Sequence, residues 1–455
     1  MTQLFAVHSA YGLATAAAAI DAQLLGDGAR GERVLVPFVS ARVPETVVGV
    51  GADPALQTLR ERFDRIEDLG ALLGPLHPSA WEPAPADLPL LERLLTRAWG
   101  IDHDDLELLV QSPQVAPART LMSIFPRARL TIIGDGLMTY SPMRVALGHP
   151  VSARITRVVH ADVVPGVRPL VGGTGAETLA VSPEAFRRVL LETDHGAPVT
   201  DDHGHPLDDG TPTALVLGQY LSALGLMTPR EEISLQRDLI DRAASWSPTR
   251  IVFKPHPAAP PQLTHAVRER ALSQGREFVE YRGAVAAEVL AQRMDAVAVV
   301  AGFSTALPTV RALFDTPIGA SGLASMQRRL TPFENSNRVP MAIVDALTRA
   351  DTPYTDPARL QQLVDAIGYA MQPEIAGHLR GRAERFLDGL DAGERDRYFA
   401  PERLAALRLP GAPAEGPLHR ALRSTGGTGR VEEWRLTARG ARRRATRAWR
   451  AIRGR

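Results

Sequence analysis

The chain has 455 residues, a length typical of two or three domains, and its hydrophobic (45%) and charged (23%) fractions are those of an ordinary globular protein. No stretch reaches the ~18–20 apolar residues of a membrane span, and the first residues lack a signal-peptide pattern. The absence of cysteine excludes disulfides and thiolate metal sites and fits a reducing compartment. A net charge of +1 indicates no particular class of partner. We therefore expect a cytoplasmic protein.

Short apolar strands alternate with helices through the first half of the chain. Strands are predicted at 3–8, 33–39, 106–111 and 129–133, with a candidate third strand at 45–50 and strand or loop at 154–163 and 168–172. Helical spacing of apolar residues marks 13–25, 55–75 and 88–99. Such alternation predicts a parallel, doubly wound sheet.

A polar stretch, 195–213, rich in Gly, Pro and Asp, interrupts this pattern and predicts a linker or long loop. A second alternating set follows it. Its strands are predicted at 214–218, 250–254, 277–281, 295–301 and 316–319, and its helices at 230–246, 259–274, 285–293, 305–314 and 358–395. The two alternating sets predict the fold class α/β, with two Rossmann-like doubly wound domains. The expected divisions are 1–195, a linker at 196–213, 214–400, and a basic tail at 401–455.

The first candidate motif is Gly134-Asp135-Gly136, directly after the predicted strand 129–133. Ligands bind at the carboxyl ends of strands in open α/β sheets, and the glycines let the backbone turn sharply there. A carboxylate in this position can act as a general base toward a hydroxyl group. The alternative is a turn aspartate that caps its own loop.

The second motif, Lys254-Pro255-His256-Pro257, follows the predicted strand 250–254. Two prolines fix the backbone on either side of one histidine. Lys254 is also the only lysine among 52 basic residues, which suggests a position where arginine does not serve. Lysine and histidine both donate hydrogen bonds to a phosphate. The alternatives are a proline-rich turn and a lysine that survives by chance.

The third motif is Ser304-Thr305, between a predicted strand and a helix, where hydroxyls and free N–H groups form an anion site. An ordinary N-cap serine is the alternative. Glu288 lies near the start of the helix 285–293, and a carboxylate there can bind vicinal ribose hydroxyls. A glutamate favoured by the helix dipole is the alternative.

With these motifs in this order, the chain resembles the bacterial sialyltransferases, and most closely the α-2,8-polysialyltransferase-type family. That family carries an Asp-Gly motif, a His-Pro motif and a Ser-Ser/Thr motif, matched here by Asp135, His256 and Ser304. The resemblance spans roughly residues 3–340. It departs at Gly134, where the family has an acidic residue, and at Ala286, where it often has proline.

The resemblance implies a GT-B fold, in which the two Rossmann-like domains face each other across a cleft. It also implies an inverting transfer of sialic acid from CMP-sialic acid to a hydroxyl of a glycan, as in capsule polysaccharide synthesis. It further implies that no metal and no cofactor are required. Asp135 would be the base, and His256 would hydrogen-bond or protonate the departing phosphate. The remaining donor-binding residues would be Lys254, Pro257, Glu288, Ser304, Thr305, Gly218 and Gln219.

Other functions remain open. Transferases of CMP-Kdo or of CDP-polyols in surface polysaccharide synthesis can carry similar Lys-Pro-His-Pro segments. A nucleotide-sugar epimerase shares the architecture and needs no acceptor, and a non-catalytic sugar-nucleotide binder is a further alternative. No Asp-x-Asp motif lies at a predicted strand end, which favours a metal-independent enzyme.

The C-terminal tail is strongly basic. From Trp434 onward it contains nine arginines and no acidic residue, and Trp434 and Trp449 bracket most of them. Such a segment is typical of a helix that binds an anionic membrane surface. A solvated tail or a contact for an anionic glycan is the alternative. The expected partners are therefore a nucleotide-sugar donor, a glycan or glycolipid acceptor and the inner face of the plasma membrane, with no nucleic acid.

Overall fold

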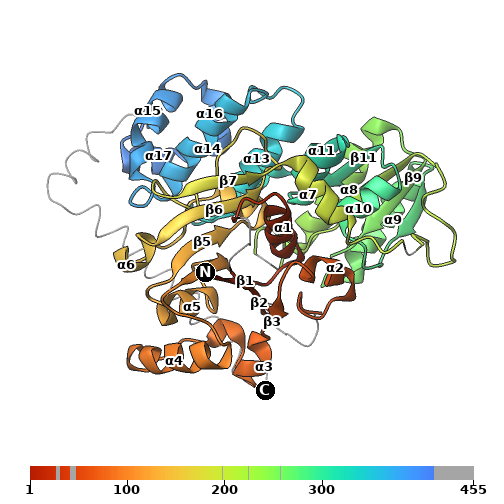
Figure 1. Cartoon of the computed structure of the whole chain (residues 1–455). Coiled ribbons are helices and arrows are strands. Elements are labelled where there is room, and N and C mark those ends of the chain that lie inside the picture. The colour runs from red at the N-terminus through yellow and green to blue at the C-terminus, as the bar shows by residue number, and fades with distance from the viewer. Residues whose placement is uncertain (27–30, 41–47, 197, 224, 257, 414–455) are drawn as a thin grey trace, which may run out of the picture.

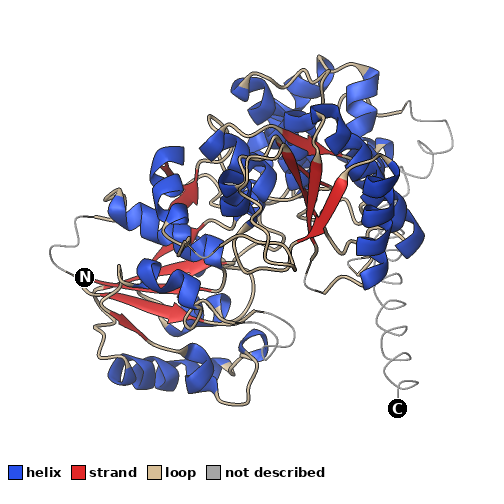
Figure 2. Ribbon diagram, turned by 90° about the vertical axis from the view of Figure 1, so that its right-hand side faces the viewer, coloured by secondary structure: helices blue, strands red, loops and turns tan. Residues whose placement is uncertain are grey.

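The computed structural model describes residues 1–413, except 27–30, 41–47, 197, 224 and 257. It contains two parallel sheets with interleaved helices (Figures 1 and 2), so the predicted α/β fold with two doubly wound halves is confirmed. Much of the basic tail and Pro257 lie outside the described residues. In the part of the chain that the structure describes, no helix is long and apolar enough to cross a membrane.

The first sheet has seven strands in the order β3-β2-β1-β4-β5-β6-β7, all paired in parallel. The strands are β1 (Thr2–Val7), β2 (Arg33–Pro37), β3 (Arg65–Ile66), β4 (Leu106–Gln111), β5 (Arg129–Ile133), β6 (Ile155–Ala161) and β7 (Glu177–Val181). Alternate residues of β1 enter two different cores, because successive side chains point to opposite faces of a strand. Leu4 packs on one face of the sheet and Phe5 on the other.

Helices cover both faces of this sheet (Figure 1). One face packs on α3 (Leu69–Leu73), α4 (Leu88–Ala98) and α5 (Ala118–Ile124). The other packs on α1 (Ala10–Asp21), α2 (Gln57–Arg60) and α7 (Pro183–Leu191). A short helix, α6 (His149–Ser152), precedes β6. Burial on both faces explains why the central strands of the sheet are mostly apolar rather than alternating.

The second sheet has five parallel strands in the order β10-β9-β8-β11-β12. They are β8 (Thr213–Leu217), β9 (Arg250–Lys254), β10 (Glu277–Glu280), β11 (Ala298–Ala301) and β12 (Ile318–Ala320). Helices α8 (Pro229–Ala243) and α9 (Pro261–Ser273) pack on one face, and α10 (Ala287–Arg293) and α11 (Ala306–Phe314) on the other. Helix α11 also packs against α7, so one continuous core joins the two halves.

The helices that follow the second sheet return to the first half (Figure 1). The first of them, α12 (Leu323–Arg329), still pairs with α8 of the second half through Arg329 and Glu231. The others are α13 (Arg338–Thr348), α14 (Pro357–Met371), α15 (Arg380–Asp388), α16 (Ala392–Tyr398) and α17 (Pro401–Leu407). Gly368 of α14 lies so close to Leu170 that an added Cβ would come within 2.3 Å of it. The backbone N–H of Arg168 also donates to Gln361. The chain therefore crosses between the halves twice, while the proposed division into residue ranges stays a prediction.

Some predicted elements were wrong. The stretch 55–75 is not one helix, because β3 separates α2 from α3, and the Asp68 side chain caps the start of α3. Residues 168–172, expected as strand or loop, are loop, whereas the edge strand β7 was missed because its side chains are mostly exposed. The candidate strand 45–50 lies largely outside the described residues, and 48–50 are not in a strand.

Candidate active site

Loops from the two sheets meet at the Asp135 motif. Asp135 follows β5, and Gly136 begins the 3-10 turn η5 (Gly136–Tyr140). The N–H of Leu137 donates to Thr305 Oγ1 at 3.4 Å, across to the loop that follows β11. Gly136 has a φ of +52°, and a Cβ there would lie 2.4 Å from Thr305 Cγ2. Glycine is thus required both for the backbone conformation and for the close approach of the two halves.

Asp135 is oriented by Gln111, the last residue of the neighbouring strand β4. Gln111 Nε2 donates to Asp135 Oδ1 at 2.9 Å, and the N–H of Asp135 donates to Thr139 Oγ1 at 2.7 Å. The Asp135 side chain is half-buried, so its second carboxylate oxygen, for which the described residues supply no hydrogen bond, can accept a proton from a ligand.

Gln111 is fully buried and its amide is saturated with hydrogen bonds. Besides Asp135, Nε2 donates to Ser9 Oγ at 2.6 Å, and Oε1 accepts from the N–H groups of His8 at 3.0 Å and Ser9 at 3.3 Å. Gly12 leaves the room for this side chain, because a Cβ at Gly12 would lie 2.5 Å from Gln111 Oε1. The glutamine therefore ties the loops after β1, β4 and β5 into one unit.

His8 completes this network at the end of β1. Its Nε2 lies 3.0 Å from Ser112 Oγ and its Nδ1 lies 3.1 Å from Ser40 Oγ. Burial lowers the pKa of His8 from its ordinary value, and the charge of Asp135 acts in the opposite direction. The imidazole therefore favours its neutral form, in which it both accepts and donates a hydrogen bond.

On the opposite side, Lys254 ends strand β9 and points along the loop before α10. Its Nζ donates to the carbonyl of Gly283 at 2.8 Å and lies 4.9 Å from the centre of the Tyr281 ring. Burial lowers the pKa of Lys254, and the nearby Glu288 carboxylate opposes that shift. Burial likewise raises the pKa of Glu288, which Lys254 counteracts. The two side chains therefore share one electrostatic environment at the end of β9 and the start of α10.

His256 is exposed, and its ring orientation is defined by one contact. The N–H of Ala258 donates to His256 Nδ1 at 3.2 Å. In the neutral ring this contact places the proton on Nε2, which has no hydrogen-bond partner among the described residues. The structure thus leaves a donor available on a solvent-facing imidazole. Pro257, predicted to bind the donor, lies outside the described residues.

Ser304 and Thr305 lie directly before α11. Ser304 Oγ accepts from the N–H of Ala306 at 3.2 Å, whereas the N-cap residue of α11 is Thr305, whose side chain makes no capping hydrogen bond. The contact with Ala306 leaves the hydroxyl proton of Ser304 without a partner in the described part of the chain. Thr305 contacts the Asp135 loop as described above.

Gly218 and Gln219, predicted to bind the donor, both hold the backbone of the second half. Gln219 Oε1 accepts from the N–H of Phe303 at 2.8 Å, and its Nε2 donates to the Phe303 carbonyl. Its polar atoms are therefore already engaged within the protein. Gly218 allows close packing, because a Cβ there would lie 2.7 Å from the Phe253 ring.

Tyr11, on the first turn of α1, lies between the two halves. Its hydroxyl is buried without a hydrogen bond of good geometry, and Thr309 of α11 is its polar neighbour. Burial raises the pKa of Tyr11, and the charges of Glu288 and Asp135 raise it further. A neutral phenol therefore separates the carboxylates of the two sides.

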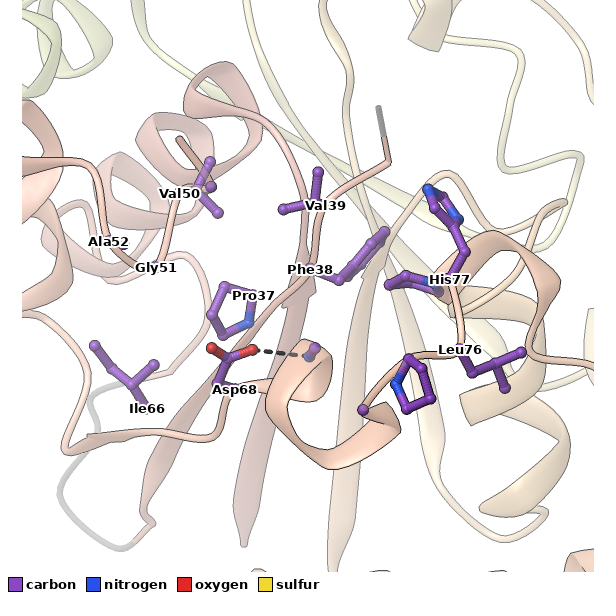
Figure 3. A pocket seen from close by; sticks show the side chains of 15 residues that line it. Pro37, Phe38, Val39, Val50, Gly51, Ala52, Ile66, Asp68, Leu76 and His77 are labelled. Atoms are coloured by element: carbon purple, nitrogen blue, oxygen red, sulfur yellow. Dashed lines mark hydrogen bonds between the residues drawn. The ribbon is translucent and has the colours of Figure 1, made fainter. Parts of the chain in front are cut away.

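A larger pocket of about 560 Å³ lies at the ends of β2 and β3 (Figure 3). Phe38 lines it and also packs against the His8 ring, with the ring centres 5.2 Å apart. Most of its walls are apolar, and the carboxylate of Asp68 faces the N–H of Gly70 at the start of α3. The pocket therefore adjoins the network that holds Asp135.

A comparison with known protein families shows to which family the chain belongs. The model of the Alpha-2,8-polysialyltransferase (POLYST) family matches residues 3–320. The chain belongs to the alpha-2,8-polysialyltransferase family. Membership in this polysialyltransferase family supports a glycosyltransferase activity, and the match includes every candidate residue from Asp135 to Thr305. No curated protein sequence matches the chain closely enough to count as a relative.

Solved structures with a distant likeness include two that hold UDP and one UDP-GlcNAc 2-epimerase. The S. aureus MnaA–UDP co-structure is 13% identical, with 82% of this chain and 97% of that chain covered and a TM-score of 0.37. The UDP-GlcNAc 2-epimerase from Methanocaldococcus jannaschii is 9% identical, with 70% and 82% covered and a TM-score of 0.39. A ugt transferase from Siraitia grosvenorii in complex with UDP is 12% identical, with 86% and 96% covered and a TM-score of 0.39. At such scores these likenesses say nothing about what this polysialyltransferase-family member binds.

The described residues contain one group of side chains with the spacing of a metal site, namely Asp102, His103 and Asp104. This group precedes β4, whereas Gln111 and Asp135 lie at the other end of the parallel strands. Asp104 pairs with Arg127 at the surface. The group therefore lies at the opposite edge of the sheet from the candidate residues of this family member.

Sequence reasoning missed Gln111, Tyr11 and the role of His8. Gln111 was visible only as the polar end of an otherwise apolar strand, LELLVQ, and that position is the signal that could have identified it. Tyr11 sits in an alanine-rich helix, where nothing in the sequence indicates that its hydroxyl reaches the space between the halves.

Proposed function

We propose that the chain transfers sialic acid from CMP-sialic acid to a hydroxyl of a glycan acceptor, with inversion at the anomeric carbon and without a metal ion. The observation that carries the proposal is the contact between the Asp135 loop and Thr305. It brings a half-buried carboxylate of one sheet to the hydroxyl-lined helix start of the other. Family membership supports the reaction class.

In the proposed reaction, the acceptor oxygen forms a bond to the anomeric carbon from the face opposite the phosphate. The bond from that carbon to the phosphate oxygen breaks, and CMP leaves with the electron pair. Asp135 takes the proton of the acceptor hydroxyl, as a general base requires. Gln111 keeps the carboxylate oriented for this step by its hydrogen bond to Oδ1.

The second half would stabilise the charge on the departing CMP. His256 has an Nε2–H without a partner among the described residues, Ser304 has a hydroxyl proton to donate, and Lys254 supplies a positive charge. These groups fit a monophosphate, since hydrogen-bond donors aimed at developing charge need no metal ion. Glu288 remains the candidate for the ribose hydroxyls. Gln219 and Gly218 would act by shaping the backbone of this site rather than by touching the donor.

A donor panel tests the proposal. The purified chain is incubated with CMP-sialic acid, CMP-Kdo, a CDP-polyol and UDP-N-acetylglucosamine, each with and without excess EDTA, and released nucleotide is measured. We expect CMP release from CMP-sialic acid, faster with a glycan acceptor and unchanged by EDTA. Consumption of a CDP-polyol or CMP-Kdo instead, an epimer formed without acceptor, or activity that only Mg²⁺ or Mn²⁺ restores would each overturn it.

The location of the reaction is part of the same proposal. We place the enzyme in the cytoplasm, with its arginine-rich tail against the inner face of the plasma membrane. The support is the charge of the sequence from Trp434 onward, which attracts anionic lipids by about 1 kcal/mol per basic residue.

A further inference from the structure

Residues 192–212, which lead from α7 to β8, form a connecting segment between the two halves, and its start is held by the first half. Arg62 Nη2 donates to Glu192 Oε1 at 2.6 Å, and His195 Nε2 lies 3.2 Å from the carbonyl oxygen of Pro54. Both Arg62 and Pro54 belong to the region of α2. The beginning of the connecting segment therefore moves with the first sheet.

The end of the connecting segment is held by the second half. Asp209 accepts from Arg250 of β9 through both carboxylate oxygens, at 3.0 and 2.8 Å. The Arg250 side chain is only 8% exposed, so this bidentate pair is anchored in the second sheet. Asp208 is the direct neighbour of Asp209 and therefore moves with the second sheet.

Arg293, the last residue of α10, bridges the two ends of the connecting segment. Its Nη1 lies 3.1 Å from Oδ1 of Asp194, which stands between the two anchored residues at the start, and its Nη2 lies 3.6 Å from Oδ2 of Asp208. The N–H of Gly196 also donates to Asp194 Oδ1, at 3.1 Å. Only 14% of the Arg293 side chain and 21% of the Asp194 side chain are exposed, so salt screens this pair less than a pair at the surface.

Helix α10 connects this bridge to the candidate site. Glu288 lies in its first turn and Arg293 at its end, so a helix of seven residues holds the two at a fixed spacing. The ring of Tyr281 faces Lys254 Nζ. Burial raises the pKa of Tyr281, and the charges of Arg293 and Asp194 act on that pKa in opposite directions. The bridge is therefore adjacent to the groups that the second half contributes, whereas the candidate base lies on the first.

We propose that Arg293 is a positioning residue, which with Asp194 and Asp208 fixes the two halves in the orientation that the transfer requires. The chemical step needs both halves at once, because the base and the leaving-group site lie on different sheets. Binding of CMP needs the second half alone. The inference rests on the proposed function, because it names the residue that aligns the two parts of the same site.

Two variants break the bridge from opposite sides, Arg293→Gln and Asp194→Asn. The double variant with both changes completes a cycle, in which a shared role appears as a non-additive loss. The matched control is Arg270→Gln, since Arg270 pairs with Asp241 at 2.7 Å between α9 and α8, entirely within the second half. Each protein is assayed for transfer from CMP-sialic acid to a glycan and, by isothermal titration calorimetry, for CMP affinity.

We expect each variant of the bridge to lower kcat at least ~10-fold, because a misplacement of about 1 Å between reacting groups can cost ~10²-fold. The Kd for CMP should stay within about twofold of wild type. The double variant should be no slower than the slower single variant, and Arg270→Gln should behave as wild type. Wild-type kcat in Arg293→Gln, additive losses in the double variant, or a CMP affinity that falls together with kcat would overturn the inference.

A distance measurement tests the alignment directly. The chain contains no cysteine, so cysteines introduced at two exposed positions, Arg188 on α7 and Gln262 on α9, can carry spin labels. Pulsed electron paramagnetic resonance then gives the distribution of distances between the halves. We expect a narrow distribution with Arg293 in place and a broader one with Arg293→Gln, and equal widths would contradict the proposed role. A wild-type enzyme that releases no CMP from CMP-sialic acid would instead contradict the proposed function, and the two distance distributions would still test the bridge.

Discussion

The two sheet edges that face each other differ in how they use their polar groups. On the first edge, Gln111 donates to Asp135 and accepts from the backbone N–H of His8, and the His8 ring contacts Ser112. On the second edge, His256 Nε2 and the hydroxyl proton of Ser304 find no partner within the described residues. One edge is internally connected, and the other leaves its donors open.

This difference matches two different chemical tasks. A base must be oriented before its substrate arrives, so its hydrogen bonds are fixed by the protein. Groups that bind a phosphate must still have free donors, because the ligand is to complete them. The comparison therefore supports our proposal of base chemistry in the first half and leaving-group binding in the second.

Replacement of the proposed base, Asp135, should give the largest loss of transfer rate. Asp135→Asn keeps the size of the side chain and an oxygen that can accept from Gln111 Nε2, but it removes the proton acceptor. Loss of a general base costs ~10²–10⁴-fold in rate, so we expect kcat for transfer to fall by that factor. Steady-state kinetics with CMP-sialic acid and a glycan acceptor measures it.

The control for this variant is Asp162→Asn. Asp162 follows β6 on the same sheet, is half-buried, and lines neither the pocket at the ends of β2 and β3 nor a smaller one of about 150 Å³ that opens on Asp135. Its transfer rate should stay close to that of wild type. Equal losses in the two variants would mean that Asp135 matters for the fold rather than as the base.

A buried histidine beneath the first edge should also make the folded protein less stable in acid. His160 on β6 lies against Gly134, and burial lowers its pKa from 6.5 to about 4. Between pH 6.5 and about pH 4, His160 is therefore protonated in the unfolded chain but neutral in the folded chain. The contribution of His160 to the free energy of unfolding is fully present above pH 6.5. It is lost as the pH falls toward 4, and the loss amounts to about 3 kcal/mol.

Urea unfolding of wild type and His160→Gln at pH 7 and pH 4 measures this contribution. The variant has no group that titrates at this position, so its free energy of unfolding should fall by less than that of wild type over the same pH interval. An identical loss in both proteins would mean that His160 is already protonated or accessible in the folded state.

A smaller loss of catalytic efficiency is expected when Lys254, on the second edge, is replaced by arginine. Lys254→Arg keeps the charge, but Lys254 Nζ fits between the Gly283 carbonyl and the Tyr281 ring, where a planar, longer guanidinium does not. We expect kcat/KM to fall at least ~10-fold, or about 1.4 kcal/mol. A converse control is Arg282→Lys, an exposed residue paired with Glu280 at the surface, which should behave as wild type. Wild-type kinetics for Lys254→Arg would mean that the single lysine has no special role.

The same contrast explains what could be predicted from the sequence. Strands with apolar residues on both faces and the Gly, Pro and Ser signals at their ends identified the two sheets and the loops with Asp135, Lys254 and Ser304. Each of these signals is local. Gln111 was missed because its role depends on loops that begin more than a hundred residues away, at His8, and only folding brings them together. The bond between Gln219 and Phe303 was invisible in the sequence for the same reason, and the donor-binding role of Gln219 stays a prediction.

The most direct test of the division between the two edges is the affinity for CMP itself, measured by isothermal titration calorimetry on folded wild type, Asp135→Asn and His256→Ala. The account predicts that Asp135→Asn binds CMP within about twofold of wild type, because the base contacts the acceptor. It predicts that His256→Ala binds CMP at least ~10-fold more weakly, because the free imidazole donor meets the phosphate. Unchanged CMP affinity in His256→Ala together with a large loss in Asp135→Asn would contradict it.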